Sequence, residues 1–402
     1  MRYRHATTGR TRLRQVLRRP LISAFLALAA AGALFSCDWK ASATPTEKGN
    51  RTVRIILLGQ SLIRHDPRDY LENPLHTVAP ILRSADVVFT NLEVAIEGAY
   101  CPCEPTRPAR SMYMHVARPT VLDYLRLINV NLLALSNNHS WDYGVNGIRS
   151  TLHEASKRGF ACAGIGNTLQ EATAPAYLQV GDTRIALVAN ATVRLKPEVL
   201  ASKTRPGVNL LRVSDQDDWE RNLAAIRRAA SNADVVLVYQ HFQVDADAVQ
   251  PGNPYGHSLV DNLTAWQERW ARASIDAGAT AYVAHGSPEH KGVEIYKGRP
   301  IFYGLGNFIF HSRQPVGHYE KEVWQSVIVE VTVRGGSVDS VSFVPIELDE
   351  GTPGEFLLEK RGFPEVADEA TGLSILTRLA ELSEAYGTQV KLDAGGARIE
   401  LN

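Results

Sequence analysis

Three apolar runs in this chain each lead into polar residues that include a histidine. VNLLALS runs into LSNNHSWDYG at residues 135–144, VVLVYQH ends on His241, and ATAYVAH ends on His285. Continuous apolar runs of this length are typical of strands that are buried on both faces of a parallel sheet. In open α/β sheets, ligands bind beyond the carboxyl ends of the strands. The sequence therefore predicts that these residues meet at one sheet edge and form a metal or phosphate site.

Apolar runs alternate with amphipathic stretches along most of the chain. The expected strands are TVRIILLG, ADVVFTN, VNLLALS, FACAGIG, RIALVANA, ADVVLVYQH, ATAYVAH and PIFYGLGN, and the expected helices are PTVLDYLRLI, GIRSTLHEASKRG, DWERNLAAIRRAASN and LTAWQERWARASIDAG. This alternation predicts an α/β sandwich with helices on both faces. Near the C-terminus, period-two alternation around Gly335 and Gly336 predicts a hairpin, followed by a helix in ATGLSILTRLAELSEAYG and one short strand.

Residues 1–37 have the features of an export signal. An Arg-rich cluster without acidic residues precedes LISAFLALAAAGALFSC, whose length suits a signal peptide rather than a membrane-spanning helix. Leu34 to Cys37 approximate a lipobox, which would make Cys37 the lipidated N-terminus of an exported protein. Such a protein would be anchored at the cell membrane and face the periplasm or the exterior. Cleavage after Ala43, an uncleaved anchor and twin-arginine export are the alternatives.

Residues 38–51 are polar, small and Pro-containing, as in a linker that holds a domain away from a membrane. We expect one folded domain over residues 52–402, because 45% of the chain is hydrophobic and can form a large core. The 43 Lys and Arg residues balance 43 Asp and Glu residues, and no nucleic-acid-binding module is recognisable. A nucleic-acid partner is therefore not expected.

Three cysteines follow the signal segment, namely Cys101, Cys103 and Cys162. In an exported protein they predict one disulfide and one free thiol, with the pairing left open. The Cys-x-Cys pair could instead bind zinc, although no second pair of Cys or His residues stands nearby at ligand spacing.

Further motifs resemble one known family. They are GxxxxR at 59–64, NLE at 91–93, NNHxxDYG at 137–144, the strand-end His241, HG at 285–286 and YxLGNF at 303–308. In order and spacing they are similar to the motifs of the CapA family, over about Val53 to Leu348. That family is associated with capsule and poly-gamma-glutamate synthesis and is related to calcineurin-like metallophosphoesterases. The resemblance implies a four-layer α/β/β/α, metallo-dependent phosphatase-like fold. It also implies an exported, surface-anchored protein that acts on an anionic cell-envelope polymer, with a membrane synthase complex as a further partner.

By the same resemblance, the strand ends hold one or two divalent ions, which would be manganese, zinc or iron. The expected ligands are Glu93, Asn138, His241, His285 and, from a reshaped loop, His290. His139 would stabilise the leaving group or act as a general acid. Asp142 would either orient His139 in catalysis or cap the helix that begins at Gly144.

Arg64 and Asn307 are the candidates for contact with substrate. A guanidinium pairs bidentately with carboxylate or phosphate, so Arg64 would clamp an anionic group and assist catalysis, unless it forms a surface salt bridge. Asn307 lies with Gly304 and Gly306 in a segment that shapes a turn. Asn91 would either bind the ion or hydrogen-bond the turn after its strand.

The chain departs from the family pattern at two ligand positions. The first motif of the family reads GD, whereas this chain has Gln60 at the position of the metal-binding Asp, and Asp66 could substitute only from a bent loop. In the last histidine motif, Pro288 takes the place of a His, which His290 or Glu289 would replace. Three functions stay open. They are a metal-dependent hydrolase or synthesis component that acts on the polymer, a metal-free polymer-binding scaffold for a capsule synthase, and an envelope phosphoesterase.

Two polar loops follow strand ends. Residues 243–262, which include His257, are expected to cover the site and select substrate. Residues 101–115 include Arg107 and Arg110, which either meet the anionic polymer or are solvated loop charges.

Overall fold

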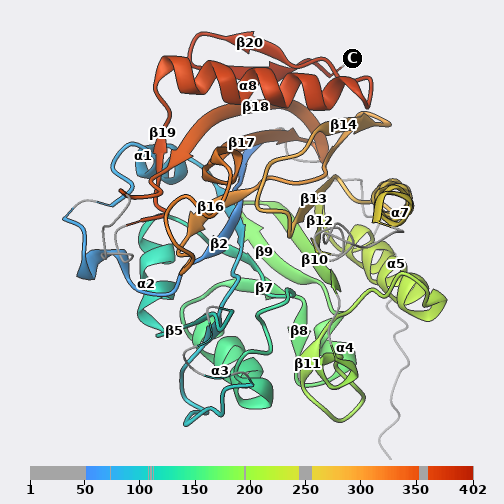
Figure 1. Ribbon diagram of the computed structural model, residues 1–402. Coiled ribbons are helices and arrows are strands. Elements are labelled where there is room, and N and C mark those ends of the chain that lie inside the picture. The colour runs from blue at the N-terminus through green and yellow to red at the C-terminus, as the bar shows by residue number, and fades with distance from the viewer. Residues whose placement is uncertain are drawn as a thin grey trace, which may run out of the picture. The chain divides into compact units, whose positions relative to one another are not determined.

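The computed structural model describes residues 51–401, except 73, 107, 109, 110, 112, 194–195, 244–255 and 353–360, and describes only the backbone of 256–263. Two β-sheets lie at its centre (Figure 1). The larger sheet has nine strands, in the order β20 (Lys391–Asp393), β21 (Gly396–Ile399), β18 (Ser337–Leu348), β17 (Gln325–Arg334), β1 (Thr52–Leu57), β3 (Val87–Asn91), β6 (Leu132–Ala134) and β7 (Ala161–Ala163), with β19 (Pro364–Val366) beside β18. Strands β1, β3, β6 and β7 are parallel, and the strands beyond β1 are antiparallel.

The smaller sheet has six strands and a parallel centre. Its order is β14 (Val293–Tyr296), β15 (Arg299–Phe302), β13 (Ala281–His285), β12 (Val235–Gln243), β10 (Thr183–Val193) and β9 (Ala176–Val180). Strands β10, β12, β13 and β15 run parallel, whereas the edge strands β9 and β14 are antiparallel to their neighbours. The predicted α/β class is therefore confirmed in its coarse form.

Short strand pairs and helices complete the described structure. The pairs are β2 (Gln60–Leu62) with β16 (Asn307–Phe310), β4 (Ala95–Ile96) with β5 (Val116–Ala117), and β8 (Ile165–Gly166) with β11 (Gly207–Val208). The α-helices are α1 (Ala79–Arg83), α2 (Thr120–Leu127), α3 (Gly144–Lys157), α4 (Leu169–Ala172), α5 (Gln216–Ala230), α7 (Gly256–Asp276) and α8 (Glu369–Glu384), and the 3-10 helices are η1 (Pro67–Asp69), η2 (Pro197–Val199) and η3 (Lys321–Trp324).

One buried core lies between the two sheets. Leu57 and Phe89 from the larger sheet belong to the same cluster as Leu187 and Tyr239 from the smaller sheet. The alternation of side chains along each strand places these residues on the inner faces. Helix α8 contributes Leu379 to this cluster and lies near β18 and β14 in Figure 1.

The outer face of each sheet is covered by helices. On the larger sheet, Ile56 and Val88 belong to a cluster with residues of α1, α2 and α3, such as Leu125. On the smaller sheet, Val188 packs in a cluster with residues of α5 and α7, such as Trp270. Because successive residues of the central strands enter different cores, both faces of these strands are buried, which explains their nearly continuous apolar runs.

Most predicted elements are confirmed. Each of the eight apolar runs contains a strand. The four amphipathic stretches coincide with α2, α3, α5 and α7, except for one or two residues beyond the helix ends. The predicted hairpin is β17–β18, and Gly335 and Gly336 form its turn with positive φ angles of 58° and 83°. Glycine tolerates this conformation without the steric cost of a side chain.

Three local predictions are wrong. FACAGIG forms two strands rather than one, because Gly164 turns the backbone between β7 and β8 with φ of 107°. The chain ends in two short strands, β20 and β21, that extend the larger sheet, whereas one was expected. Helix α7 begins at Gly256, so the C-terminal part of the predicted loop 243–262 is helical.

Several predictions fall outside the described residues. They concern the signal and lipid anchor in 1–37, the linker 38–51, Arg107, Arg110, most of the loop after His241 and the side chain of His257. The described residues belong to one compact unit, Thr46–Asn402. None of the helices in this part of the chain is both long enough and apolar enough to cross a bilayer.

Candidate functional site

The segment after β3 carries Glu93 to the end of the inter-sheet core. The backbone N–H of Glu93 donates a hydrogen bond to the carbonyl oxygen of Ser61 at 2.9 Å, which links this segment to β2. The Glu93 side chain is 3% exposed, and its Oε2 atom has no hydrogen-bond partner. Burial, reinforced by the charge of Asp142, raises the pKa of Glu93 to about 8.

The turn after β6 is held by Asn137. Its Nδ2 group donates to Asn91 Oδ1 at 3.0 Å and to the Leu92 carbonyl oxygen at 2.8 Å. Its Oδ1 atom accepts the backbone N–H of His139 at 2.9 Å. One buried amide thus joins the ends of β3 and β6. Asn91 therefore hydrogen-bonds this turn through its Oδ1 atom. Asn138, which follows Asn137, has a buried Oδ1 atom without a partner.

His139 is oriented by Asp142. The two side chains approach at 2.9 Å between Nδ1 and Oδ2, and the same Oδ2 accepts the backbone N–H of His115 at 2.7 Å. Helix α3 is preceded by Tyr143 at its N-cap, without a side-chain cap hydrogen bond, so the Asp142 carboxylate faces the histidine rather than capping the helix. A carboxylate that accepts from Nδ1–H leaves Nε2 as the nitrogen that exchanges a proton with a ligand.

His115 was missed by sequence reasoning. Its ring lies 3.9 Å from the ring of His139, measured between centroids. His115 lies in the segment before β5, so β5 and β6 separate it along the chain from the turn that contains His139. No sequence motif links the two. Only the pairing of β4 with β5 brings this segment beside the turn.

His241 and His285 are adjacent across two parallel strands. They are register partners of β12 and β13. His241 Nδ1 lies 3.2 Å from the Tyr239 hydroxyl, and its Nε2 lies 3.9 Å from Glu93 Oε1. Burial lowers the pKa of both histidines to about 3, with a further contribution from His139 at His241 and from His241 at His285. Both rings are therefore neutral at pH 7 and available as ligands.

The turn after β13 requires glycine. Gly286 has φ of 112°, and a Cβ atom there would collide with the Phe242 carbonyl oxygen. Its N–H donates to Gln60 Oε1 at 3.2 Å. The close approach of the backbones keeps His285 at the end of its strand.

Gln60 stands where the family motif is expected to have an aspartate, and both ends of its amide are hydrogen-bonded. Besides accepting from Gly286, it donates through Nε2 to Asn307 Oδ1 at 2.9 Å. Asn307 donates in turn to the Val323 carbonyl oxygen at 3.0 Å. The Gln60 amide thus braces β2, β16 and the turn after β13, and both ends of the Asn307 amide are engaged within the protein.

Arg64 lies close enough to Asp142 for the two charges to interact. Burial and the nearby Arg313 lower the pKa of Arg64 to about 10, and Asp142 opposes this shift. Its backbone N–H donates to His311 Nδ1 at 3.1 Å, and its Nη1 atom is buried without a hydrogen-bond partner. Arg64 forms no ion pair with a described carboxylate, so a guanidinium nitrogen stays available to an anion.

The three substitute ligands are differently placed. Asp66 accepts from the backbone and guanidinium of Arg68, and Glu289 pairs with Arg378 at 2.6 Å. His290 is buried and forms an isolated bridge with Leu305. The pKa of His290 is lowered to about 4 by burial and then by Arg378, which places it toward α8. No hydrogen bond or ion pair links it to the other candidate ligands within the described residues.

The remaining donors form a set suited to a divalent ion. Among the expected ligands, the buried atoms without hydrogen-bond partners are Glu93 Oε2, Asn138 Oδ1, His241 Nε2 and both ring nitrogens of His285 and of His290. Carboxylate, amide oxygen and imidazole are ligand types for manganese, iron and zinc. Across the described part of the chain, no three His, Cys, Asp or Glu side chains already stand in coordination geometry. Glu93 lies 3.9 Å from His241, and His241 and His285 are register partners, so these three donors are neighbours without being fixed at ligand positions.

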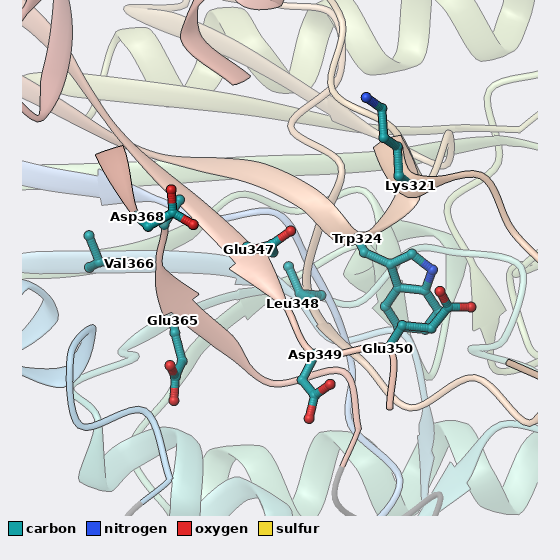
Figure 2. Close-up of a pocket in the computed structure, with 10 residues that line it drawn as sticks. Lys321, Trp324, Glu347, Leu348, Asp349, Glu350, Glu365, Val366 and Asp368 are labelled. Atoms are coloured by element: carbon teal, nitrogen blue, oxygen red, sulfur yellow. The ribbon is translucent and has the colours of Figure 1, made fainter. Parts of the chain in front are cut away.

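A separate hollow of about 520 Å³ lies between η3 and the end of β18 (Figure 2). Its lining residues include one lysine and five carboxylates, and the latter are Glu347, Asp349, Glu350, Glu365 and Asp368. None of the candidate ligands lines it. An anionic substrate would be repelled there, so the hollow is distinct in both place and charge from the strand-end site.

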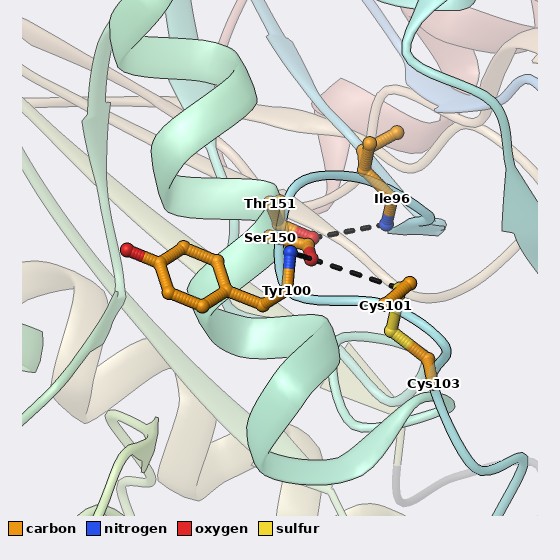
Figure 3. The surroundings of a disulfide bond; sticks show 6 residues. All are labelled: Ile96, Tyr100, Cys101, Cys103, Ser150 and Thr151. Carbon is orange, nitrogen blue, oxygen red and sulfur yellow. Dashed lines mark hydrogen bonds between the residues drawn. A yellow bond between two sulfur atoms is a disulfide. The ribbon is translucent and has the colours of Figure 1, made fainter.

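The loop between β4 and β5 contains the disulfide. Cys101 is bonded to Cys103, and Cys162 is free (Figure 3). The prediction of one disulfide and one free thiol is confirmed, and the zinc alternative for the Cys-x-Cys pair is wrong because both sulfurs are used. This loop leads to His115, whose ring lies beside that of His139.

Comparison with known proteins agrees with the motif order. A model of the family described as bacterial capsule synthesis protein PGA_cap matches residues 54–312. Protein y4sH of Sinorhizobium fredii is 30% identical over 400 residues, covering 79% of this chain and 86% of that protein. The PGA biosynthesis protein CapA of Bacillus subtilis is 28% identical, covering 74% and 71%. The capsule biosynthesis protein CapA of Bacillus anthracis is 25% identical, covering 69% and 61%. This chain belongs to the bacterial capsule synthesis protein PGA_cap family, the CapA family.

Proposed function

We propose that this protein is an exported, membrane-anchored accessory protein in the synthesis or processing of an anionic capsule polymer of the poly-gamma-glutamate type. Its family and the printed names of two relatives, a PGA biosynthesis protein and a capsule biosynthesis protein, support the polymer context. The signal-like segment at residues 1–37 supports export and lipid anchoring. A membrane synthase of the polymer would be its partner.

The proposed architecture is a four-layer α/β/β/α sandwich of the metallo-dependent phosphatase type. Three separate cores support it, with one between the sheets and one under the helices on each outer face. In such a sandwich, the carboxyl ends of the parallel strands from both sheets open toward the same site.

The proposed site binds a divalent ion, and the unpartnered buried donors carry this proposal. Leaving a polar group buried without a partner costs about 1–3 kcal/mol. Glu93, Asn138, His241 and His285 together leave several such atoms at one end of the inter-sheet core. One ion could coordinate one atom of each of these side chains, while the other ring nitrogen of each histidine keeps its proton. A purely structural site would leave these atoms without compensation.

The surrounding side chains have proposed roles in hydrolysis. A bound divalent ion would supply Lewis-acid activation of the scissile group and of water. Asp142 holds Nδ1–H of His139, so Nε2 would deliver a proton to the leaving group. Arg64 would bind an anionic group of the substrate through its free guanidinium edge.

A metal-free polymer-binding scaffold is the second candidate. One observation favours it, because Gln60 adds no charge at a ligand position and is satisfied by hydrogen bonds within the protein. An envelope phosphoesterase is the third candidate and would use the same ion site on a smaller substrate.

Elemental analysis of the purified full chain tests the ion site. After exposure to manganese, zinc and iron, the wild type should retain one of them, and His241→Ala should lose most of it. His76→Ala is the matched control, because His76 is an exposed imidazole near Glu365. Equal metal content in wild type and His241→Ala would contradict the proposed site. Hydrolysis assays on poly-gamma-glutamate and on a phosphoester would then separate the two enzymatic candidates.

A further inference from the structure

A second hollow lies along α3, beside the disulfide loop. Its volume is about 370 Å³, and its lining consists of Tyr100, Arg149, Leu152, His153, Ser156, Lys157 and Asn167. Five of these residues belong to α3, so one helix face forms most of the floor. The lining has no carboxylate and two permanent cations, in contrast to the acidic hollow of Figure 2.

The basic side chains of this hollow form a regular row. Arg149, His153 and Lys157 are four residues apart on α3 and all exposed. Residues at this spacing lie on one face of a helix, about 6 Å apart along its axis. A row of this kind suits a chain with repeated negative groups better than a single small anion.

The acidic side chains near this row pair with a different residue. Glu154 and Asp123 both pair with Arg158, at 2.5 Å and 2.7 Å. Lys157 also helps to lower the pKa of the Asp123 carboxyl group, although its contribution is smaller than those of Arg158 and Arg68. Within the described residues, neither Arg149 nor Lys157 forms an ion pair.

Tyr100 forms one wall of the hollow and is held in place. Its backbone N–H donates to Ser150 Oγ of α3 at 3.2 Å, and the Ile96 N–H donates to Thr151 Oγ1 at 3.0 Å (Figure 3). The disulfide follows directly at Cys101. The Tyr100 ring is 48% exposed and meets the His153 ring edge-on, with centroids 5.9 Å apart. The phenol therefore offers a hydroxyl and an apolar face to a ligand.

The row begins near the strand-end site. Helix α3 starts at Gly144, two residues after Asp142, so Arg149 and Lys157 lie about 8 Å and about 20 Å from its start along the helix axis, at about 1.5 Å per residue. A polymer with one unit at the strand-end site could continue along this row.

We propose that the hollow along α3 is a binding subsite for a polyanionic chain that carries carboxylates at repeated intervals. This inference rests on the proposed function, because the chain would be the polymer that the strand-end site acts on. Arg149 and Lys157 bind carboxylates of successive units, and Tyr100 packs against the backbone between them. The subsite makes affinity depend on polymer length and weakens it as salt rises.

Binding of labelled poly-gamma-glutamate to the full chain tests the subsite. Arg149→Ala/Lys157→Ala should weaken binding by about tenfold, as expected for two exposed ion pairs at the upper end of their usual strength. Lys203→Ala/Arg228→Ala removes the same charge from other exposed positions and should leave affinity unchanged. The metal content of each preparation, measured in parallel, should be equal.

Each contrary result has a defined meaning. Wild-type affinity in the double variant would overturn the subsite and leave the proposed ion site standing. Absence of polymer binding by the wild type would also overturn it, and metal uptake would still report separately on the strand-end site. Equal or tighter binding of single-stranded DNA of the same charge would overturn the assignment to a carboxylate chain.

Discussion

Glu93 Oε1 lies 3.9 Å from His241 Nε2, although the two residues come from segments of different sheets. Glu93 follows β3 of the larger sheet, and His241 lies in β12 of the smaller one. Burial raises the pKa of Glu93 to about 8 and lowers that of His241 to about 3. At pH 7 and without an ion, the contact therefore joins a neutral acid and a neutral imidazole. Binding of a cation would have to release the proton of Glu93.

The protonated Glu93 predicts a particular pH dependence of stability. Its pKa is raised in the folded state from an ordinary value of 4.5, so its contribution is greatest at low pH and is lost as pH rises toward about 8. Glu93→Gln removes this titration. The free energy of unfolding of the metal-free wild type, minus that of Glu93→Gln, should fall by on the order of 1 kcal/mol per pH unit between about pH 5 and 8. Urea unfolding across this range measures it, and a flat difference would contradict a buried, protonated Glu93.

Asp142→Asn should impair the proposed general acid without unfolding the site. The substitution keeps the shape of the side chain but removes the charge that holds Nδ1–H of His139. We expect hydrolysis to slow by about 10- to 100-fold with KM little changed. Nitrogen chemical shifts of His139 should also show a changed tautomer population, which a purely structural role would not produce. Asp123→Asn, at an exposed carboxylate paired with Arg158, is the matched control and should behave as wild type.

Gln60→Asp should convert a weakened ion site into a stronger one. The shorter carboxylate would abandon part of the bracing to Asn307 and Gly286 and supply a charged ligand. We expect metal content to rise from about one ion per chain to about two. Gln60→Ala removes the brace without adding charge and should not show this rise. Unchanged stoichiometry in Gln60→Asp, with the protein folded, would argue that the second position is absent for other reasons.

Phe89 should be a major contributor to the inter-sheet core beneath the site. It is 1% exposed, and its ring lies 5.7 Å from that of Tyr239 and 6.3 Å from that of His285. Phe89→Ala should lower the free energy of unfolding by about 3–5 kcal/mol, because it leaves a cavity between the sheets. Leu373→Ala, at a residue that is 57% exposed, should change it by less than about 0.5 kcal/mol. Chemical denaturation of both variants compares them, and a similar small loss in both would show that the sheets do not pack through Phe89.

The candidate site was only partly predictable from sequence. Asn138, His139, His241 and His285 stand at strand ends, where the buried parallel strands make their convergence predictable. His115 could not be found this way, because it reaches His139 through the path of a loop. The environment of His290 also could not, since it depends on how α8 packs against the turn after β13.

Local patterns in the sequence were enough to predict the alternation of strands and helices, the β17–β18 hairpin, one disulfide and the family. These properties follow from local patterns, namely apolar periodicity, turn glycines and motif order. The tertiary structure decided that Asp142 faces His139 and does not cap α3, and that Gln60 braces three segments. It also decided that Arg149, Lys157 and Tyr100 share one hollow. The contacts of Gln60 and the position of Tyr100 beside α3 join separate segments, which only tertiary packing brings within a few ångströms.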